Sequence, residues 1–404
     1  MGNYTLQHVI PAVLNLTPER QAALIAEVDA VVHNTLELRR AFAASGRQLD
    51  KSAWKLVATR DDVRAYRSRR AVHGVETSAP LRPSPTSPTS SSTSSSSKCT
   101  SHSSACAAGL ESDRRRSKPT GRPPAVVLSG TVDGTEEDAV LGLLAHSEQH
   151  CMMRHSYLGT ELEDARLLCV LARPTAARPF DFLGVKWGRQ TYGRFSQPRD
   201  FVFLEATGTT TDADGAVVGY SVRQSTDLSD VLALPRSPDV LRGHLSVCHT
   251  FANTDTSTGG ARHRSVEMFS RAFLQLDGGV PVNVAAAALA DKLLALVNTA
   301  ESATAYKLTW MMRQALRHPH AGGVTHHCAN CVHSLCTLST LLLHRGGACQ
   351  VCRRAYCGKC AVTKKISISI GSEVVQKSLL FCLECLLEAK HLSARQVAAD
   401  QQRW

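Results

Sequence analysis

The chain has 404 residues, 43% of them hydrophobic, which is enough apolar material for two or three folded units. Its formal net charge of +11 favours anionic partners such as phospholipid headgroups, although a basic surface without a dedicated partner fits the composition equally well. The sequence contains no run of about 18 apolar residues, and residues 1–20 lack the basic and apolar stretches of a signal peptide. We therefore expect a cytoplasmic protein without a membrane span.

The first predicted element is a helix over residues 17–44, because Thr17 is a suitable N-cap and Pro18 suits the first turn. We assign residues 1–49 to an N-terminal helical segment that packs on the next part of the chain. Two short strands, residues 54–60 and 63–69, come next and are separated by a turn.

Residues 75–124 are rich in Ser, Thr and Pro and end in a basic run. Too few of them are apolar to offset the entropy of an ordered chain, so the composition predicts a disordered insertion. Contact of the basic run with an anionic surface is the alternative to a solvated linker.

The ordered pattern resumes with an apolar strand at residues 125–132 and a helix from Thr135, where Asp138 is placed to complete a capping box. Further strands are predicted at 165–171, 201–206, 216–223, 243–251 and 265–276, separated by turn residues. Several dispersed histidines have no metal-ligand spacing and are expected at the surface: His146, His150, His155, His244 and His249.

A long helix is predicted from Pro281 to Arg317, because apolar residues recur on one stripe: Leu289, Leu293, Leu296, Ala300 and Ala303. A strand pair, a capped helix, several antiparallel strands and a closing helix describe an α+β domain in which a curved sheet grips a helix. This order resembles the START or START-like helix-grip family of lipid-binding domains over residues 50–317, interrupted by the insertion. The resemblance implies an apolar cavity for a sterol, phospholipid or other hydrophobic ligand, and a filled core of the same shape is the alternative.

Eight cysteines near the C-terminus form four Cys-x-x-Cys pairs, a spacing typical of tetrahedral zinc sites. Metal explains them better than disulfides, since a chain without a secretory leader meets a reducing environment. Only four residues separate Cys352 from Cys357, so neighbouring pairs cannot easily fold back on one ion and an alternating arrangement is expected. One zinc ion is assigned to Cys328, Cys331, Cys357 and Cys360, and the second to Cys349, Cys352, Cys382 and Cys385. All four positions at each ion are filled by protein, so both sites are structural.

The two-zinc module spans residues 322–390 and contains a predicted hairpin over residues 364–381, followed by a C-terminal tail at residues 391–404. It is too small to bury much apolar surface and should depend on metal for its fold. The array resembles the FYVE zinc-finger family, a cross-brace finger similar to PHD fingers, and residues 353–360 are especially similar to its centre. That family binds phosphatidylinositol 3-phosphate through a basic motif, of which only Arg345 is present here.

The resemblance also implies a membrane-contacting loop, at the place where Leu341, Leu342 and Leu343 precede Arg345. With Arg353 and Arg354 they are assigned to contacts with membrane phospholipids or phosphoinositides. The alternative is that these leucines pack inside the fold. Trp310 is followed by Met-Met-Arg, which departs from the family's Trp-x-x-Asp, and little lipid specificity is therefore expected.

Taken together, the motifs predict a zinc-binding, non-enzymatic, lipid- or membrane-associated adaptor, and the resemblance implies a peripheral place on endosomal membranes in trafficking. No nucleophile elbow, phosphate-binding glycine loop or open metal site is present in the sequence, so no catalytic residue is assigned. The alternatives are a RING-like ubiquitin ligase and a zinc-dependent protein-interaction module. Nucleic acid is not the expected partner, and the sequence identifies no protein partner.

Overall fold

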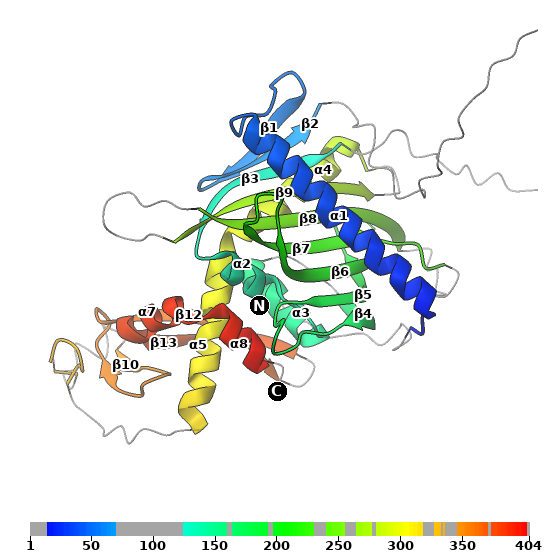
Figure 1. Cartoon of the computed structure of the whole chain (residues 1–404). Coiled ribbons are helices and arrows are strands. Elements are labelled where there is room, and N and C mark those ends of the chain that lie inside the picture. Colours follow the sequence, from blue (N-terminus) through cyan, green and yellow to red (C-terminus); the bar gives the residue numbers. More distant parts are fainter. Residues whose placement is uncertain are drawn as a thin grey trace, which may run out of the picture.

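The computed structural model describes residues 14–69, 124–159, 164–192, 197–229, 240–254, 264–276, 280–317, 327–332, 334–335, 346–370 and 373–401. Residues 75–123 of the predicted disordered insertion lie outside the described residues. The two parts that position the candidate sites are a large sheet domain and, below it in Figure 1, a small cysteine-rich finger that carries β10 to β13 and α7.

A nine-stranded sheet forms the centre of the sheet domain, with the order β1-β2-β3-β9-β8-β7-β6-β5-β4. All neighbouring strands in this order run antiparallel. The strands are β1 (Trp54–Arg60), β2 (Val63–Ser68), β3 (Val126–Asp133), β4 (Asp164–Ala172), β5 (Phe182–Gln190), β6 (Arg199–Thr211), β7 (Val217–Ser225), β8 (Leu241–Thr254) and β9 (Ser265–Leu276).

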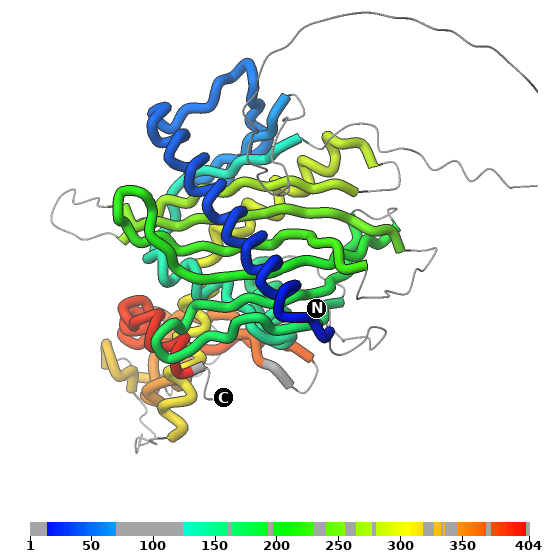
Figure 2. Tube along the Cα trace, turned by 45° about the vertical axis from the view of Figure 1, so that its right-hand side comes forward, coloured from blue at the N-terminus to red at the C-terminus, as the bar shows by residue number. Residues whose placement is uncertain are grey.

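Helices cover both faces of this sheet. One face carries α1 alone, which crosses the strands diagonally in Figures 1 and 2. The opposite face, which we call the inner face, carries α2 (Glu136–Leu143), α3 (Glu148–Leu158), α4 (Val282–Leu294) and α5 (Thr299–Arg317). The predicted α+β class, an antiparallel sheet with C-terminal helices and a small cysteine-rich finger, is confirmed.

Helix α1 (Pro18–Ala44) begins as predicted, with the Thr17 hydroxyl accepting a hydrogen bond from the backbone N–H of Arg20. Its buried side chains, among them Leu24 and Val28, pack on Leu204 and other outer-face residues of the sheet. The helix is therefore a third layer of the sheet domain, and position 49 does not separate two folded units.

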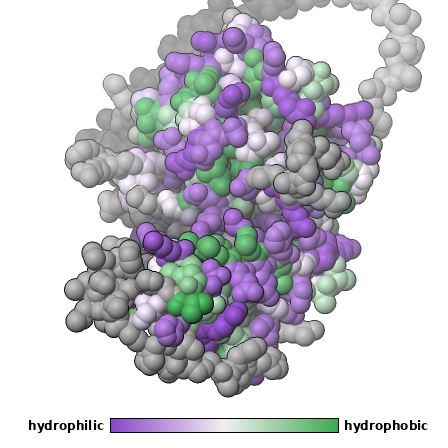
Figure 3. Space-filling view, turned by 90° about the vertical axis from the view of Figure 1, so that its left-hand side faces the viewer, coloured by the Kyte–Doolittle hydropathy of each residue, from purple (hydrophilic) through white to green (hydrophobic). Residues whose placement is uncertain are grey.

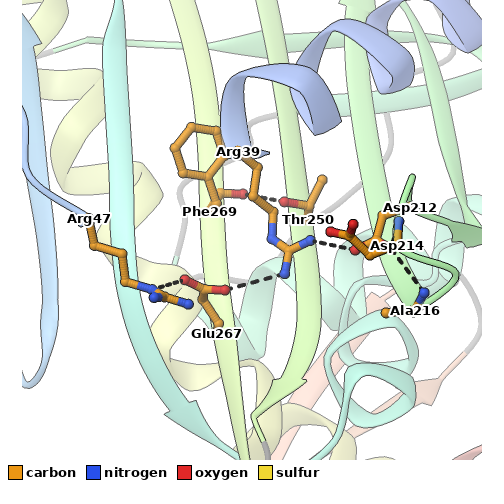
Figure 4. A network of polar contacts seen from close by, with 8 residues as sticks. All are labelled: Arg39, Arg47, Asp212, Asp214, Ala216, Thr250, Glu267 and Phe269. Atoms are coloured by element: carbon orange, nitrogen blue, oxygen red, sulfur yellow. Dashed lines mark hydrogen bonds and ion pairs between the residues drawn. The ribbon is translucent and has the colours of Figure 1, made fainter. Parts of the chain in front are cut away.

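Ion pairs fasten the C-terminal half of α1 to the sheet (Figure 4). The guanidinium of Arg39 lies 3.3 Å from a carboxylate oxygen of Asp212 and 3.3 Å from one of Glu267. The other oxygen of Glu267 lies 2.6 Å from Nε of Arg47, just beyond the helix. One carboxylate on β9 thus holds two arginines, in addition to the apolar contact between Phe42 and Phe269.

The predicted strand pair at residues 54–69 and the capping box of α2 are confirmed, since Thr135 and Asp138 bond to each other's backbone N–H. Within the sheet domain α3 and β5 were not predicted, and β10, β11, α7 and α8 were not predicted either. The predicted long helix is correct in extent, but a 3-10 turn at Ala295–Asn298 divides it into α4 and α5.

The stretch Val282–Arg317 is also the one helix of the described chain that is long and apolar enough to span a bilayer. Half of its apolar window is buried inside the fold. Core helices pass the same test, and the buried Leu289, Leu293 and Leu308 show that this stretch packs inside the protein.

The finger contains a short strand pair, β10 (Gly347–Ala348) with β11 (Ala355–Tyr356), the hairpin of β12 (Ala361–Ile370) with β13 (Glu373–Cys382), and α7 (Leu383–His391). The hairpin was predicted. It packs on α3 and α5 of the sheet domain, with Leu308 and Met311 of α5 in the same apolar cluster as the cysteines. The finger therefore shares a core with the sheet domain.

The residues assigned to a C-terminal tail are helical over most of the part that the structure describes. Residues Ala394–Gln401 form α8, which packs on α2 and α5. Val397 is 0% exposed and Ala398 1% exposed, both within the main core of the sheet domain. The chain thus returns from the finger to the sheet domain before it ends.

Candidate metal centres and the cavity between sheet and helices

Eight cysteine sulfurs gather into two groups of four. The groups are Cys328, Cys331, Cys357 and Cys360, and Cys349, Cys352, Cys382 and Cys385, and within each group the sulfurs lie within 4.8 Å of one another. Individual separations are 3.6 Å for Cys331 to Cys357 and 3.9 Å for Cys352 to Cys382. The edge of a tetrahedron of sulfurs about 2.3 Å from a central zinc is about 3.8 Å, while a disulfide needs about 2.0 Å. Each group therefore has the dimensions of a metal site and not of a disulfide.

The first two cysteine pairs lie on the same kind of tight turn. The residue after each pair has a left-handed backbone, with φ of 58° at Val332 and 61° at Arg353. Its N–H bonds back to the carbonyl of the first cysteine, at 2.9 Å for Val332 to Cys328 and 3.0 Å for Arg353 to Cys349. These turns direct both sulfurs of a pair to one side of the chain.

The fourth pair uses the start of a helix. Cys382 is the N-cap of α7, and its sulfur accepts a hydrogen bond from the backbone N–H of Cys385 at 3.4 Å. The positive end of the helix dipole and this N–H both favour a thiolate over a thiol. Burial nevertheless raises the pKa of Cys382, and the backbone N–H of Cys385 offsets part of that rise.

Hydrogen bonds favour the thiolate at the first cysteine of each of the first two pairs. A hydrogen bond from the Cys385 thiol lowers the pKa of Cys349 to about 4. Burial alone would raise the pKa of Cys328, but backbone N–H donors, that of Cys331 first, outweigh it and lower the pKa to about 6.

Two further polar groups support the sulfurs and were not predicted from the sequence. Nδ2 of Asn330 donates to the sulfur of Cys360 at 3.3 Å, and the Tyr356 hydroxyl lies 3.7 Å from that of Cys352. Burial and hydrogen bonds to Cys382 and Cys352 raise the pKa of Tyr356, so its hydroxyl keeps its proton and donates. Donors of this kind are typical of the surroundings of metal-bound thiolates.

The structure describes only two of the residues assigned to membrane contact. Leu341, Leu342, Leu343 and Arg345 lie outside the described residues. Arg353 and Arg354 are exposed on the finger, and Nη2 of Arg354 lies 2.9 Å from a carboxylate oxygen of Glu384 in α7.

Trp310, the residue compared with the lipid-binding tryptophan motif, instead donates a hydrogen bond of 3.1 Å to Asp400 in α8. This bond joins the last turns of α5 to the C-terminal helix. In the described structure Trp310 thus has a contact inside the protein.

The finger exposes apolar side chains that were not predicted to contact a membrane. Leu383 is 44% exposed and Leu387 55% exposed, one turn apart on α7 and beside the ion pair of Arg354 with Glu384. Figure 3 shows apolar side chains among hydrophilic ones on the lower part of the molecule, where the finger lies. This surface combines two exposed leucines with an arginine that is ion-paired to Glu384.

A small cavity lies between the inner face of the sheet and the helices, at the place where the sequence predicted a ligand cavity. Its volume is about 60 Å³, and apolar walls come from α3, α4, the 3-10 turn and β8, including Leu158, Leu289, Leu296 and Val247. Pockets for drug-sized ligands usually measure about 300–1,000 Å³. In this conformation the space is close to the filled core that was the alternative prediction.

A cluster of buried charges lies next to this cavity, and its member Arg154 lines the cavity wall. Arg154 of α3 donates to the carboxylate of Glu205 on β6, and Nζ of Lys186 on β5 lies 2.9 Å from its other oxygen. The three residues are almost fully buried, with exposures of 4%, 0% and 2% for Arg154, Glu205 and Lys186. Burial alone would raise the pKa of Glu205, but Arg154 and Lys186 outweigh it and hold the pKa below its ordinary value.

The prediction of surface histidines holds for the exposed His244, whereas His146 and His150 are half-buried and the other two are buried. His155 is 7% exposed and His249 2% exposed, and both line the cavity. Burial, with the neighbouring Arg223 and Arg154, lowers the pKa of His249 to about 3, so its ring is neutral at physiological pH. The sequence offered no signal for this, because His249 follows Cys248 without any motif spacing.

A larger groove of about 490 Å³ lies elsewhere, between the β1–β2 turn, α5 and the end of α7. Its walls are mainly polar and carry acids such as Asp133 and Glu301 together with bases such as Lys390. Lys307 and Asp138 in its floor are paired at 2.5 Å. The groove has neither the place nor the apolar lining of the predicted ligand cavity.

Comparisons with known proteins give a low level of likeness. No protein-family model matches the chain, and no curated protein does. Among solved structures, human StAR-related lipid transfer protein 5 is similar with 14% identity and a TM-score of 0.40, over 70% of this chain and 97% of that one. Human STARD10 is similar with 12% identity and a TM-score of 0.36, over 69% of this chain and 82% of that one. Likeness at this level carries no conclusion about a ligand.

Proposed function

We propose that this chain is a zinc-binding, non-enzymatic adaptor that associates with lipid or membrane surfaces. The observation that carries the proposal is the pair of four-sulfur groups, each with the spacing of a tetrahedral thiolate site. Four thiolates would fill the coordination of each zinc ion and leave no position for a catalytic water. Zinc at these sites would hold the turns of the finger together and supply no chemistry of its own.

Membrane association is supported by the surface of α7. Leucines one turn apart at 383 and 387 are exposed next to a cationic arginine, a combination that suits the boundary between headgroups and acyl chains. The net charge of +11 adds a general attraction to anionic lipids. We extend the proposal to a cytoplasmic protein that visits endosomal membranes.

Ligand binding between sheet and helices is the second part of the proposal. The described cavity of about 60 Å³ combines apolar walls with charged side chains such as that of Arg154, which is the composition of a site for an amphipathic molecule. A larger ligand would enter by displacing the α4 segment, which the 3-10 turn at Ala295–Asn298 separates from α5.

Flotation of the purified full-length protein with phosphatidylcholine vesicles, alone or mixed with phosphatidylserine or single phosphoinositides, tests the membrane role. We expect binding to anionic vesicles that the double variant Leu383→Ser with Leu387→Ser reduces. The control Leu56→Ser changes a leucine of similar exposure, 48%, on β1.

A second set of variants, Arg345→Ala and serine substitutions at 341–343, tests the loop residues assigned from the sequence. Binding to none of the vesicles contradicts a membrane role and favours the protein-interaction alternative. Transfer of ubiquitin to a lysine in the presence of a conjugating enzyme contradicts the absence of enzyme activity and supports the RING-like alternative.

A further inference from the structure

The buried charges on the inner face do not balance. Among the described residues, Arg154, Lys186 and Arg223 surround one carboxylate, that of Glu205. Arg223 on β7 lines the cavity, and its charge helps to lower the pKa of Glu205. The ion pairs of the Glu205 carboxylate, however, are formed with Arg154 and Lys186. The interior of the sheet domain therefore carries two more positive charges than negative ones at this place.

The surplus charge is held at an energetic cost. Burial and the nearby Arg154 lower the pKa of Arg223, which means that its charged form is destabilised here. A guanidinium still keeps its proton under all physiological conditions, so the charge stays. An anion placed against Arg223 would reduce the imbalance, because a charge withdrawn from water is stabilised when it is paired.

An unused polar atom lies in the same wall. Nδ1 of His249 is 2.8 Å from the Ser270 hydroxyl, while Nε2 is buried and has no hydrogen-bond partner within the described chain. When Ser270 donates to Nδ1, the proton of the neutral ring resides on Nε2, which becomes a donor beside Arg223. A buried donor without a partner indicates a site where another molecule completes the hydrogen bonding.

The rest of the lining selects the shape of that molecule. On the helix side the wall is apolar, with Leu289, Leu293 and Leu296, and at one side Nζ of Lys292 lies 4.6 Å from the ring centroid of Tyr192. The volume of about 60 Å³ suffices for a small oxyanion group and not for a hydrocarbon chain. A tail would continue along the apolar wall after α4 moves outward.

We propose that this cavity binds the oxyanion head, a carboxylate or phosphate, of an amphipathic ligand, with Arg223 and the Nε2 atom of His249 as its contacts. Lys292, in the cavity wall beside Tyr192, adds a second cation. The inference rests on the proposed ligand binding between sheet and helices, and it adds that an anionic ligand is preferred over a neutral one with the same tail.

Calorimetric titration of the full-length protein with matched ligands tests the preference. Oleate is compared with oleyl alcohol, which has the same chain without the charge, and inorganic phosphate and acetate represent the free anions. We expect oleate to bind at least about tenfold more tightly than oleyl alcohol, as one charge-assisted hydrogen bond would give. Arg223→Gln should remove that preference, Arg223→Lys should keep most of it, and the exposed control Arg178→Gln should leave it unchanged.

The outcomes separate the inference from the function on which it rests. Equal affinity for oleate and oleyl alcohol overturns the anion preference and leaves ligand binding intact, whereas binding of neither overturns both. If phosphate or acetate alone binds as tightly as oleate, the amphipathic part is wrong.

Thermal unfolding provides a measurement that does not need a ligand. Arg223→Gln should raise the melting temperature of the free protein, because it removes a half-buried cation for which the described residues supply no ion pair. A lower melting temperature would mean that the guanidinium is structural, and this result overturns its assignment to the ligand.

Discussion

The sulfur of Cys331 lies 3.6 Å from the sulfur of Cys357, although these cysteines are 26 positions apart in the sequence. Between them in sequence lie Cys349 and Cys352, whose sulfurs join the other group. The chain thus alternates between the groups, so that neither can be lost without loosening the turns that hold the other. The stability of the finger, and of the sheet domain on which it packs, should depend on this alternation.

Val332 should be a strained residue of the finger. Its φ of 58° is costly for a β-branched side chain, and the side chain is 73% exposed, so that little packing offsets the cost. Val332→Gly should raise the free energy of unfolding of the metal-loaded protein by about 1 kcal/mol in denaturant titrations. Val217→Gly is the control, because this exposed valine lies in extended strand β7 and its replacement should lower stability. No gain for Val332→Gly contradicts the strained turn.

The C-terminal helix α8 should contribute to the stability of the sheet domain. Val397 is 0% exposed in the main core, so Val397→Asp buries a charge and should cost about 3 kcal/mol or more. Gln396→Asp introduces the same charge at the exposed neighbouring position and should change stability little. Equal unfolding midpoints for the two variants would contradict the packing of residues 394–401 in the core.

Stability should decrease below neutral pH because buried histidines resist protonation. Burial first, then nearby cations, lowers the pKa of His249 to about 3 and that of His146 to about 4. In the unfolded chain both titrate near 6.5, so below that pH the unfolded state binds more protons and gains stability. Each histidine should contribute a loss of up to about 1.4 kcal/mol per pH unit between pH 6 and its folded pKa.

Denaturant unfolding at several pH values checks this slope. His249→Gln keeps a polar side chain without the titration, and its stability should therefore fall less steeply with acid than that of the wild type. Metal loss in acid affects both proteins alike, so the difference between the slopes isolates the histidine. Parallel slopes would mean that His249 is protonated in the folded state.

Metal removal should reach the sheet domain through α3. The Ser156 hydroxyl lies 2.6 Å from that of Ser367 on β12, and the Tyr157 hydroxyl accepts a 2.8 Å bond from the Ser367 backbone N–H. The preceding residues Arg154 and His155 line the cavity, so one short helix faces both sites. After chelation, hydrogen exchange should increase in residues 148–158 and in the hairpin, while α1 on the opposite face stays protected. Unchanged exchange in α3 would show that the finger and the cavity are independent.

Elements with local signals were predictable from the sequence. Thr17 and Pro18 mark the start of α1, Thr135 and Asp138 mark α2, and turn residues separate most strands. The cysteine spacing indicated the two sulfur groups, because a four-residue gap restricts which pairs can meet. These signals lie within a few residues of one another and do not depend on tertiary packing.

The sequence did not predict two elements that are buried on both sides, α3 and β5. Helix α3 lies between the sheet and the finger and buries Met152, Met153, Arg154 and His155 in succession, so that its sequence shows no apolar stripe. Strand β5 has seven consecutive buried residues from Phe182 to Gly188 and lacks the alternation of a half-exposed strand. The caps Ser147 and Gly159 were the available signals for α3.

The charge cluster beside the cavity could not be predicted either. Arg154, Lys186, Glu205 and Arg223 come from four different elements, and none has a spacing that suggests contact with the others. Burial of Glu205 on the inner face depends on the register of β6, which pairs Glu205 with Gly184 on one side and Arg223 on the other. Contacts of this kind become visible only in the folded sheet.

The most direct test of the metal centres is elemental analysis of the purified full-length protein by mass spectrometry. We predict two zinc ions per chain, and one in each of the variants Cys331→Ser and Cys352→Ser, which remove a sulfur from different groups. Fewer than two ions in the unmodified protein, or two ions retained in both variants, would contradict the account.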